Sequence, residues 1–106
     1  MIKLKLSLEY HCYPLWIYSE YDELIDNNFP VELTTNMIID ELLDEIQKEF
    51  DNLFIDNEIE FTYAGFKDDL KKREFYKKIS NAEKMIIETL GNKGVFINQT
   101  SVETQS

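Results

Sequence analysis

Carboxylates recur at helical spacing in the middle of this 106-residue sequence. Asp40 lies four residues before Asp44, and Glu41 lies four residues before Glu45, so each pair would share one side of a helix. Paired carboxylates can hold metal ions or divide the roles of general acid and general base. A two-metal helical site also needs histidines, and the chain has only His11. A catalytic pair needs an apolar pocket, whereas these acids follow the polar side of an amphipathic pattern. They therefore predict a helix face that is either solvated or used to bind a partner.

Other arrangements that carry chemistry do not occur in the sequence. His11 and Cys12 are adjacent, and adjacent residues of a strand point to opposite faces, so they form no metal site. The sequence has no Gly-x-Ser-x-Gly elbow, and its three glycines are too few for a phosphate-binding loop. Residues 22–33 resemble a calcium loop in their acids alone, because Leu24 and Leu33 occupy ligand positions. We expect no enzyme, no metal and no cofactor.

The net charge of −10 is concentrated in one region of the chain. Residues 20–60 contain fourteen acids and one base, Lys48, whereas residues 67–78 contain six bases and three acids. Phosphate backbones and anionic membranes would repel such a chain, so neither is expected as a direct partner. A basic protein is the partner that this charge favours. The single cysteine, and a first segment that alternates instead of forming an apolar signal, favour the cytoplasm.

Aromatic residues are frequent near the beginning of the chain. If Leu15 and Ile17 face the core, Trp16 and Tyr18 face the other side of the sheet, where aromatic side chains are typical interface anchors. The alternative is that they only cover a sheet edge. The predicted partner-binding residues combine these aromatics with the acids: Trp16, Tyr18, Tyr21, Glu20, Asp22, Glu23, Asp40, Glu41, Asp44, Glu45, Glu49 and Asp51.

The hydrophobic periodicity predicts the elements that would position these residues. Alternation indicates strands, and apolar spacing of three and four indicates helices. The expected strands are 2–10, 15–18, 24–26, 58–63 and 95–97. One helix follows the candidate N-caps Thr34, Thr35 and Asn36 and has apolar residues from Ile39 to Leu53. A second helix begins near Asp68 or Asp69 and ends at Gly91.

These elements predict an α+β fold. We expect an antiparallel-rich sheet of four to five strands with two helices on one face, in the order β-β-β-α-β-α-β. Residues 1–97 would form a single domain, and residues 98–106 a polar, flexible tail.

Two segments carry a resemblance to a known type of protein. The runs 14–18, 23–27 and 30–33, and then 50–57 and 60–66, resemble small acidic proteins of low-GC bacteria that act as immunity proteins of polymorphic or contact-dependent toxin systems. The resemblance covers residues 10–66 and contains no motif with a known mechanism. It implies a tight one-to-one complex with a toxin domain.

Three functions remain open at this point. The first is an acidic inhibitor of a basic, nuclease-type protein, whose association would be steered by charge. The second is a phage-encoded antagonist of a host nucleic-acid enzyme. The third is a small-molecule-binding domain with a pocket between sheet and helices.

Overall fold

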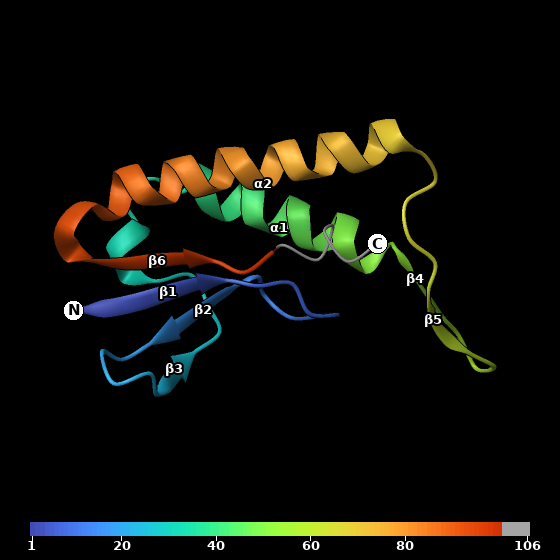
Figure 1. Cartoon of the computed structure of the whole chain (residues 1–106). Helices are drawn as coiled ribbons and strands as arrows, with labels where there is room; N and C mark the ends of the chain where they lie inside the picture. The colour runs from blue at the N-terminus through green and yellow to red at the C-terminus, as the bar shows by residue number, and fades with distance from the viewer. Residues whose placement is uncertain (101–106) are drawn as a thin grey trace.

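Four strands form the main sheet of this computed structural model, which describes residues 1–100 (Figure 1). The strands are β1 (Ile2–Leu6), β2 (Leu15–Tyr18), β3 (Leu24–Asp26) and β6 (Gly94–Asn98). Their order across the sheet is β3-β2-β1-β6. β1 pairs antiparallel with β2, and β2 with β3, but β6 runs parallel to β1. The sheet is therefore mixed, and its first three strands match the predicted antiparallel order.

The alternation of β1 separates the two faces of this sheet. Leu4 and Leu6 are fully buried beneath the helices, together with Leu15 of β2. Lys3 and Lys5 point to the opposite side, because successive strand residues alternate between faces. The strand ends at Leu6 and not at residue 10 as predicted. Residues 7–14 instead form a loop, which is closed by a hydrogen bond from the Ser7 amide to the Pro14 carbonyl oxygen.

Both helices cover the same face of the sheet, as predicted (Figure 1). The helices are α1 (Ile38–Asp51) and α2 (Asp69–Leu90), with short 3₁₀ turns at η1 (Val31–Leu33) and η2 (Gly91–Lys93). Their apolar sides pack against each other and against the sheet. The core includes Leu33, Ile39, Leu43, Ile46, Phe75, Ile79, Ala82, Ile86 and Leu90.

The ends of α2 are those that the sequence indicates. The Asp68 carboxylate accepts a hydrogen bond from the Lys71 amide at 2.8 Å and caps the first turn. Gly91 has φ 56° and ends the helix, in a backbone region that favours glycine. Neither end of the helix depends on distant parts of the chain, which is why the local sequence predicts both.

The start of α1 differs from the prediction. Its N-cap is Met37, which makes no side-chain capping bond, and none of the residues 34–36 fills that role. The Thr34 hydroxyl instead donates to the Val31 carbonyl oxygen at 2.8 Å and closes η1. The helix also ends at Asp51, before the predicted apolar residue Leu53. A capping residue that lies between two turns can hydrogen-bond to either of them. Here Thr34 bonds to the 3₁₀ turn η1 and not to α1.

The strand predicted at 58–63 is present only at residues 61–63, is exposed instead of half-buried, and pairs with a strand that was not predicted. β4 (Phe54–Asp56) and β5 (Phe61–Tyr63) pair with each other as a separate antiparallel hairpin, and the order becomes β-β-β-α-β-β-α-β. The turn residues at 56 and 57, interpreted as the end of a helical region, instead lie at the end of β4 and at the start of the four-residue hairpin loop 57–60. The β4–β5 hairpin projects away from the main sheet (Figure 1).

The end of the described chain continues the main sheet for a short distance. Asn98 is the last residue of β6, and the Gln99 amide donates to the Leu6 carbonyl oxygen at 2.8 Å. Thr100 is buried. Of the tail predicted for residues 98–106, residues 101–106 lie outside the described part. Among residues 1–100, neither helix has the length and apolar character needed to cross a membrane.

Candidate functional site

The predicted partner-binding residues fall on two separate surfaces. Six acids lie on α1, which covers one face of the main sheet (Figure 1). We call them the acidic face: Asp40, Glu41, Asp44, Glu45, Glu49 and Asp51. The other six predicted residues lie on β2 and in the β2–β3 turn, which belong to the sheet itself. The fold does not bring the two sets together.

Two carboxylates of the acidic face hold the loop 7–14 in place. The Tyr13 hydroxyl donates to Asp40 at 2.5 Å. Asp51 accepts a hydrogen bond from the His11 amide at 2.9 Å and another from the Gln47 side chain at 2.8 Å. Burial and the neighbouring Asp40 carboxylate raise the pKa of Tyr13, so its hydroxyl stays protonated as a donor. These two acids therefore have structural roles inside the molecule.

Two further carboxylates join the helices. The Lys78 ammonium of α2 lies 2.7 Å from a Glu45 oxygen and 2.6 Å from a Glu49 oxygen. Hydrogen bonds to these two carboxylates raise the pKa of Lys78, which stays charged at neutral pH. Part of the basic segment thus neutralises part of the acidic face within the same molecule.

Glu41 and Asp44 are the members of the acidic face that remain unused. Both are exposed, and neither forms a hydrogen bond or an ion pair with any residue among 1–100. Desolvation and the nearby Asp40 carboxylate raise the pKa of Asp44, and the Lys48 ammonium offsets this rise only in part. The charge of Asp44 is therefore unfavourable in the free protein, and a cation supplied from outside would stabilise it.

Replacing Asp44 with asparagine is expected to raise the free energy of unfolding at pH 7 by at most ~0.5 kcal/mol, because relief of desolvation and of the Asp40 repulsion outweighs the lost attraction to Lys48. Because the folded state raises the pKa of Asp44 above its ordinary value, the charge costs stability at neutral pH. That cost disappears as the pH falls through the raised pKa. The stability difference should therefore be present in urea unfolding curves at neutral pH and absent below about pH 3. An equal difference at both pH values would contradict the electrostatic origin.

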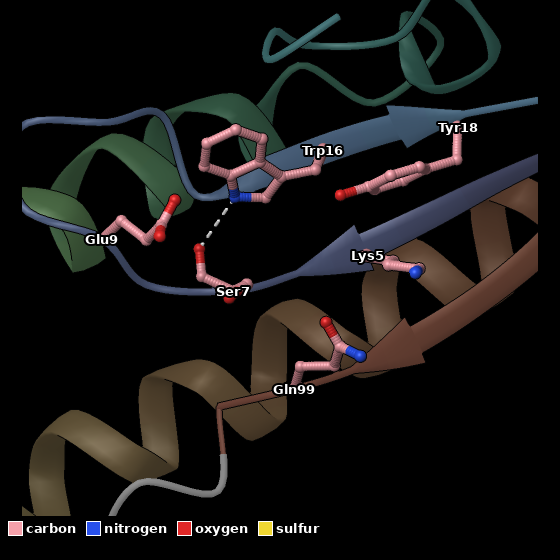
Figure 2. A pocket seen from close by; sticks show the side chains of 6 residues that line it. All are labelled: Lys5, Ser7, Glu9, Trp16, Tyr18 and Gln99. Carbon is pink, nitrogen blue, oxygen red and sulfur yellow. Dashed lines mark hydrogen bonds between the residues drawn. The ribbon is translucent and has the colours of Figure 1, made fainter. Parts of the chain in front are cut away.

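The second surface is the side of the main sheet that faces away from the helices, which we call the open face. Trp16 and Tyr18 lie on it, half-buried, as predicted from the alternation of β2 (Figure 2). The Trp16 indole N–H donates to the Ser7 carbonyl oxygen at 3.1 Å. The Lys5 ammonium lies 4.3 Å from the centre of the Tyr18 ring, within the range of a cation–π contact.

A shallow hollow lies between these side chains (Figure 2). Its volume is about 150 Å³. Pockets for drug-sized ligands usually measure about 300–1,000 Å³. Its lining residues are Lys5, Ser7, Glu9, Trp16, Tyr18 and Gln99. The hollow is too small to favour the small-molecule function over a protein-binding surface.

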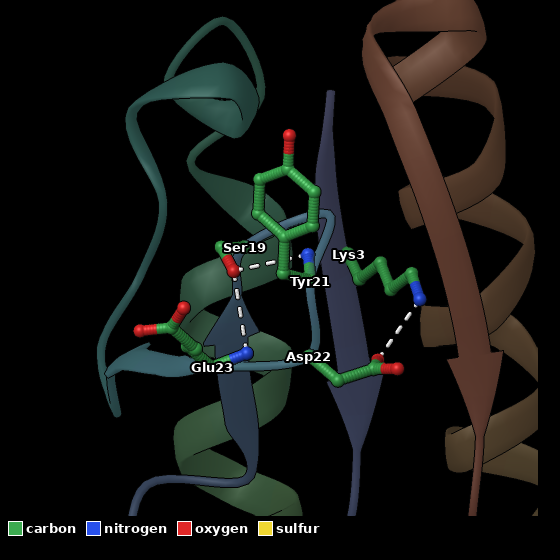
Figure 3. Close-up of polar contacts among 5 residues, drawn as sticks. All are labelled: Lys3, Ser19, Tyr21, Asp22 and Glu23. Carbon is green, nitrogen blue, oxygen red and sulfur yellow. Dashed lines mark hydrogen bonds and ion pairs between the residues drawn. The ribbon is translucent and has the colours of Figure 1, made fainter.

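The β2–β3 turn borders the open face and is held by its own hydrogen bonds (Figure 3). The Ser19 hydroxyl oxygen accepts from the amides of Tyr21 at 3.1 Å and Glu23 at 3.2 Å. Asp22 pairs with Lys3 at 2.9 Å, and this contact lowers the pKa of its carboxyl group. Tyr21 is 77% exposed. The turn therefore presents Tyr21 to solvent from an ordered backbone.

No protein-family model matches this chain, and the comparison with curated proteins found no match.

Metal binding finds no support in the described residues. Within residues 1–100, no three side chains of histidine, cysteine, aspartate or glutamate are placed to hold one ion.

One exposed surface was missed by the sequence reasoning. The β4–β5 hairpin presents Ile55, Ile59, Phe61 and Tyr63 to solvent, and none of them was predicted to bind a partner. The sequence Asp56-Asn57-Glu58-Ile59-Glu60 could have indicated this surface, because it places one isoleucine among turn and acidic residues. The alternation of residues 58–63 instead predicted a half-buried strand, so no exposed apolar surface was predicted there.

Proposed function

We propose that this protein binds a single basic protein and inhibits it, as an immunity protein neutralises a nuclease-type toxin domain. The proposed complex forms in the cytoplasm and involves no catalysis by this chain. The observation that carries the proposal is the state of Glu41 and Asp44. They are exposed neighbours on one helix that form no hydrogen bond or ion pair with residues 1–100, and Lys48 offsets the charge of Asp44 only in part, although the other acids of that face are paired.

The charge distribution supports the same proposal. Fourteen acids and one base in residues 20–60 make this part of the chain strongly negative, which attracts a basic surface and speeds association. The resemblance of residues 10–66 to acidic immunity proteins agrees with it. The open face adds Trp16, Tyr18 and Tyr21, residue types that are enriched at the centres of protein interfaces.

The first test is a capture experiment with tagged protein in extract of the native host. We expect one basic protein to be retained in stoichiometric amount at about 50 mM salt and largely lost at about 500 mM, because salt screens charge attraction. Mass spectrometry then identifies the partner, and an activity assay of that partner tests inhibition. Absence of a retained basic protein at either salt concentration would refute the proposal.

Charge reversal at the two unpaired acids is the second test. The double variant Glu41→Lys/Asp44→Lys should bind the captured partner at least about tenfold more weakly, mainly through slower association. Its free energy of unfolding should stay within about 1 kcal/mol of the wild type, because both side chains are exposed and lose only weak charge interactions within α1. Affinity and rates can be measured by surface plasmon resonance.

A matched control separates local charge from total charge. Glu74→Lys/Glu88→Lys introduces the same change in net charge at exposed positions of α2. This control should keep affinity within about threefold of the wild type. If both double variants lose affinity equally, the partner responds to the net charge and not to the acidic face.

A further inference from the structure

Ile59 is the most exposed large apolar residue of the described chain, at 94% of its surface. It occupies the third position of the four-residue loop 57–60 that joins β4 and β5. Such loops favour glycine, asparagine, aspartate or serine. Neither Glu58 nor Ile59 has a positive φ, so the backbone would accept a polar residue there. Nothing inside the molecule requires an isoleucine at this position.

The loop that carries Ile59 is ordered by its neighbours. The Asn57 side-chain oxygen accepts from the amides of Ile59 at 2.8 Å and Glu60 at 3.0 Å. The Asn57 amide donates to the Glu60 carbonyl oxygen at 3.0 Å. These bonds fix the tip in one shape before any binding, which reduces the entropy lost when a partner holds it.

The base of the β4–β5 hairpin is anchored to the body of the protein. The Leu53 carbonyl oxygen accepts from the amides of Ala64 at 2.7 Å and Gly65 at 3.0 Å. Phe54 contacts the ring of Phe50 with centroids 5.3 Å apart and that of Tyr10 with centroids 4.8 Å apart. An isolated two-stranded hairpin is marginally stable in water, and these contacts supply the missing support. The projecting end is therefore held by a packed base (Figure 1).

The charge around Ile59 indicates what kind of surface would cover it. Glu58 and Glu60 flank it, Asp56 precedes it at the end of β4, and residues 49–66 contain no lysine or arginine. An apolar pocket with a basic rim would be complementary to this tip. A symmetric contact between two hairpins would instead place the acids of one copy against the same acids of the other.

We propose that the β4–β5 hairpin inserts Ile59 into an apolar pocket of the basic partner, with Glu58 and Glu60 meeting cations at its rim. This inference rests on the proposed function, because it requires that the protein bind a basic protein. It adds a second contact element, which lies on a part of the chain distinct from α1 and from the open face.

The test uses the purified partner obtained by the capture experiment. Ile59→Asn should weaken its affinity about 10- to 100-fold, the effect of losing one buried aliphatic side chain at an interface. Ile59→Leu should restore binding to within about threefold of the wild type. Ile87→Asn is the matched control, because Ile87 is 52% exposed on α2, and it should bind like the wild type.

A photo-crosslinking amino acid at position 59 gives an independent measurement. We expect it to label one peptide of the partner that contains apolar residues beside lysine or arginine. Circular dichroism and thermal unfolding of Ile59→Asn should match the wild type, because the side chain has no buried contact to lose.

The outcomes separate this inference from the proposed function. Unchanged affinity of Ile59→Asn for a genuine basic partner overturns the role of the hairpin and leaves the proposed function standing. Failure to retain any basic protein overturns both. A dimer of the purified wild type that dissociates in Ile59→Asn, measured by sedimentation velocity, would assign the tip to a second copy and also overturn the inference.

Discussion

Replacing Phe75 with alanine is expected to lower the free energy of unfolding by about 3–5 kcal/mol. Phe75 lies on α2 and is only 1% exposed in the core between helices and sheet. Its ring contacts those of Phe66 and Tyr76, with centroids 5.3 and 5.2 Å apart. Truncation removes this apolar surface and leaves a cavity that the surrounding side chains fill only in part. The loss can be measured by urea unfolding followed by circular dichroism.

Leu70→Ala is the control for that measurement. Leu70 lies on the same helix but is 59% exposed, so its truncation should change stability by less than about 1 kcal/mol. Similar losses at both positions would mean that α2 does not bury the face described here. This comparison also tests the partner-binding surfaces indirectly, because the Lys78 contacts with Glu45 and Glu49 require α2 to lie in this orientation.

Replacing Gly94 with alanine is expected to cost about 1–3 kcal/mol and to loosen the pairing of β6 with β1. A Cβ at this position would lie 2.7 Å from the Ile2 carbonyl oxygen and 3.0 Å from its Cγ1. The oxygen belongs to the backbone, so the strands must move apart. The φ of Gly94 is −174°, which any residue adopts, and the cost is therefore steric.

Hydrogen exchange distinguishes this effect from an ordinary glycine effect. Gly94→Ala should speed amide exchange along β1 and β6, including the Gln99 amide that donates to Leu6. Gly91→Ala is the control. It strains a left-handed residue at the end of α2 but places no atom within 4 Å of the new Cβ. In this control, amide exchange should become faster only at the end of α2. Unchanged exchange in β1 and β6 of Gly94→Ala would refute the proposed contact.

Much of the fold follows from local sequence patterns. The alternation that begins at residue 2 predicts β1 correctly except for its end, and the spacing of three and four along α2 and the signals at Asp68 and Gly91 predict α2 correctly. These features depend on neighbouring residues alone. The β4–β5 hairpin was missed because alternation predicts a half-buried strand without specifying what covers it. Here most of that strand is exposed, and Tyr10 and Phe54 pack against Phe61 from one side.

In the candidate site, too, some features follow from the local sequence and others depend on contacts with distant parts of the chain. The sequence by itself determined that the chain is acidic in one region, that α1 carries its acids on one side, and that Trp16 and Tyr18 oppose the buried residues of β2. Tertiary structure alone decided which acids remain available. Asp40 and Glu45 are equivalent to Glu41 and Asp44 by pattern, yet Tyr13 holds the first and Lys78 the second. Periodicity gives the direction in which a side chain points. Whether it meets a partner from a distant part of the chain depends on how the loop 7–14 and α2 pack against α1.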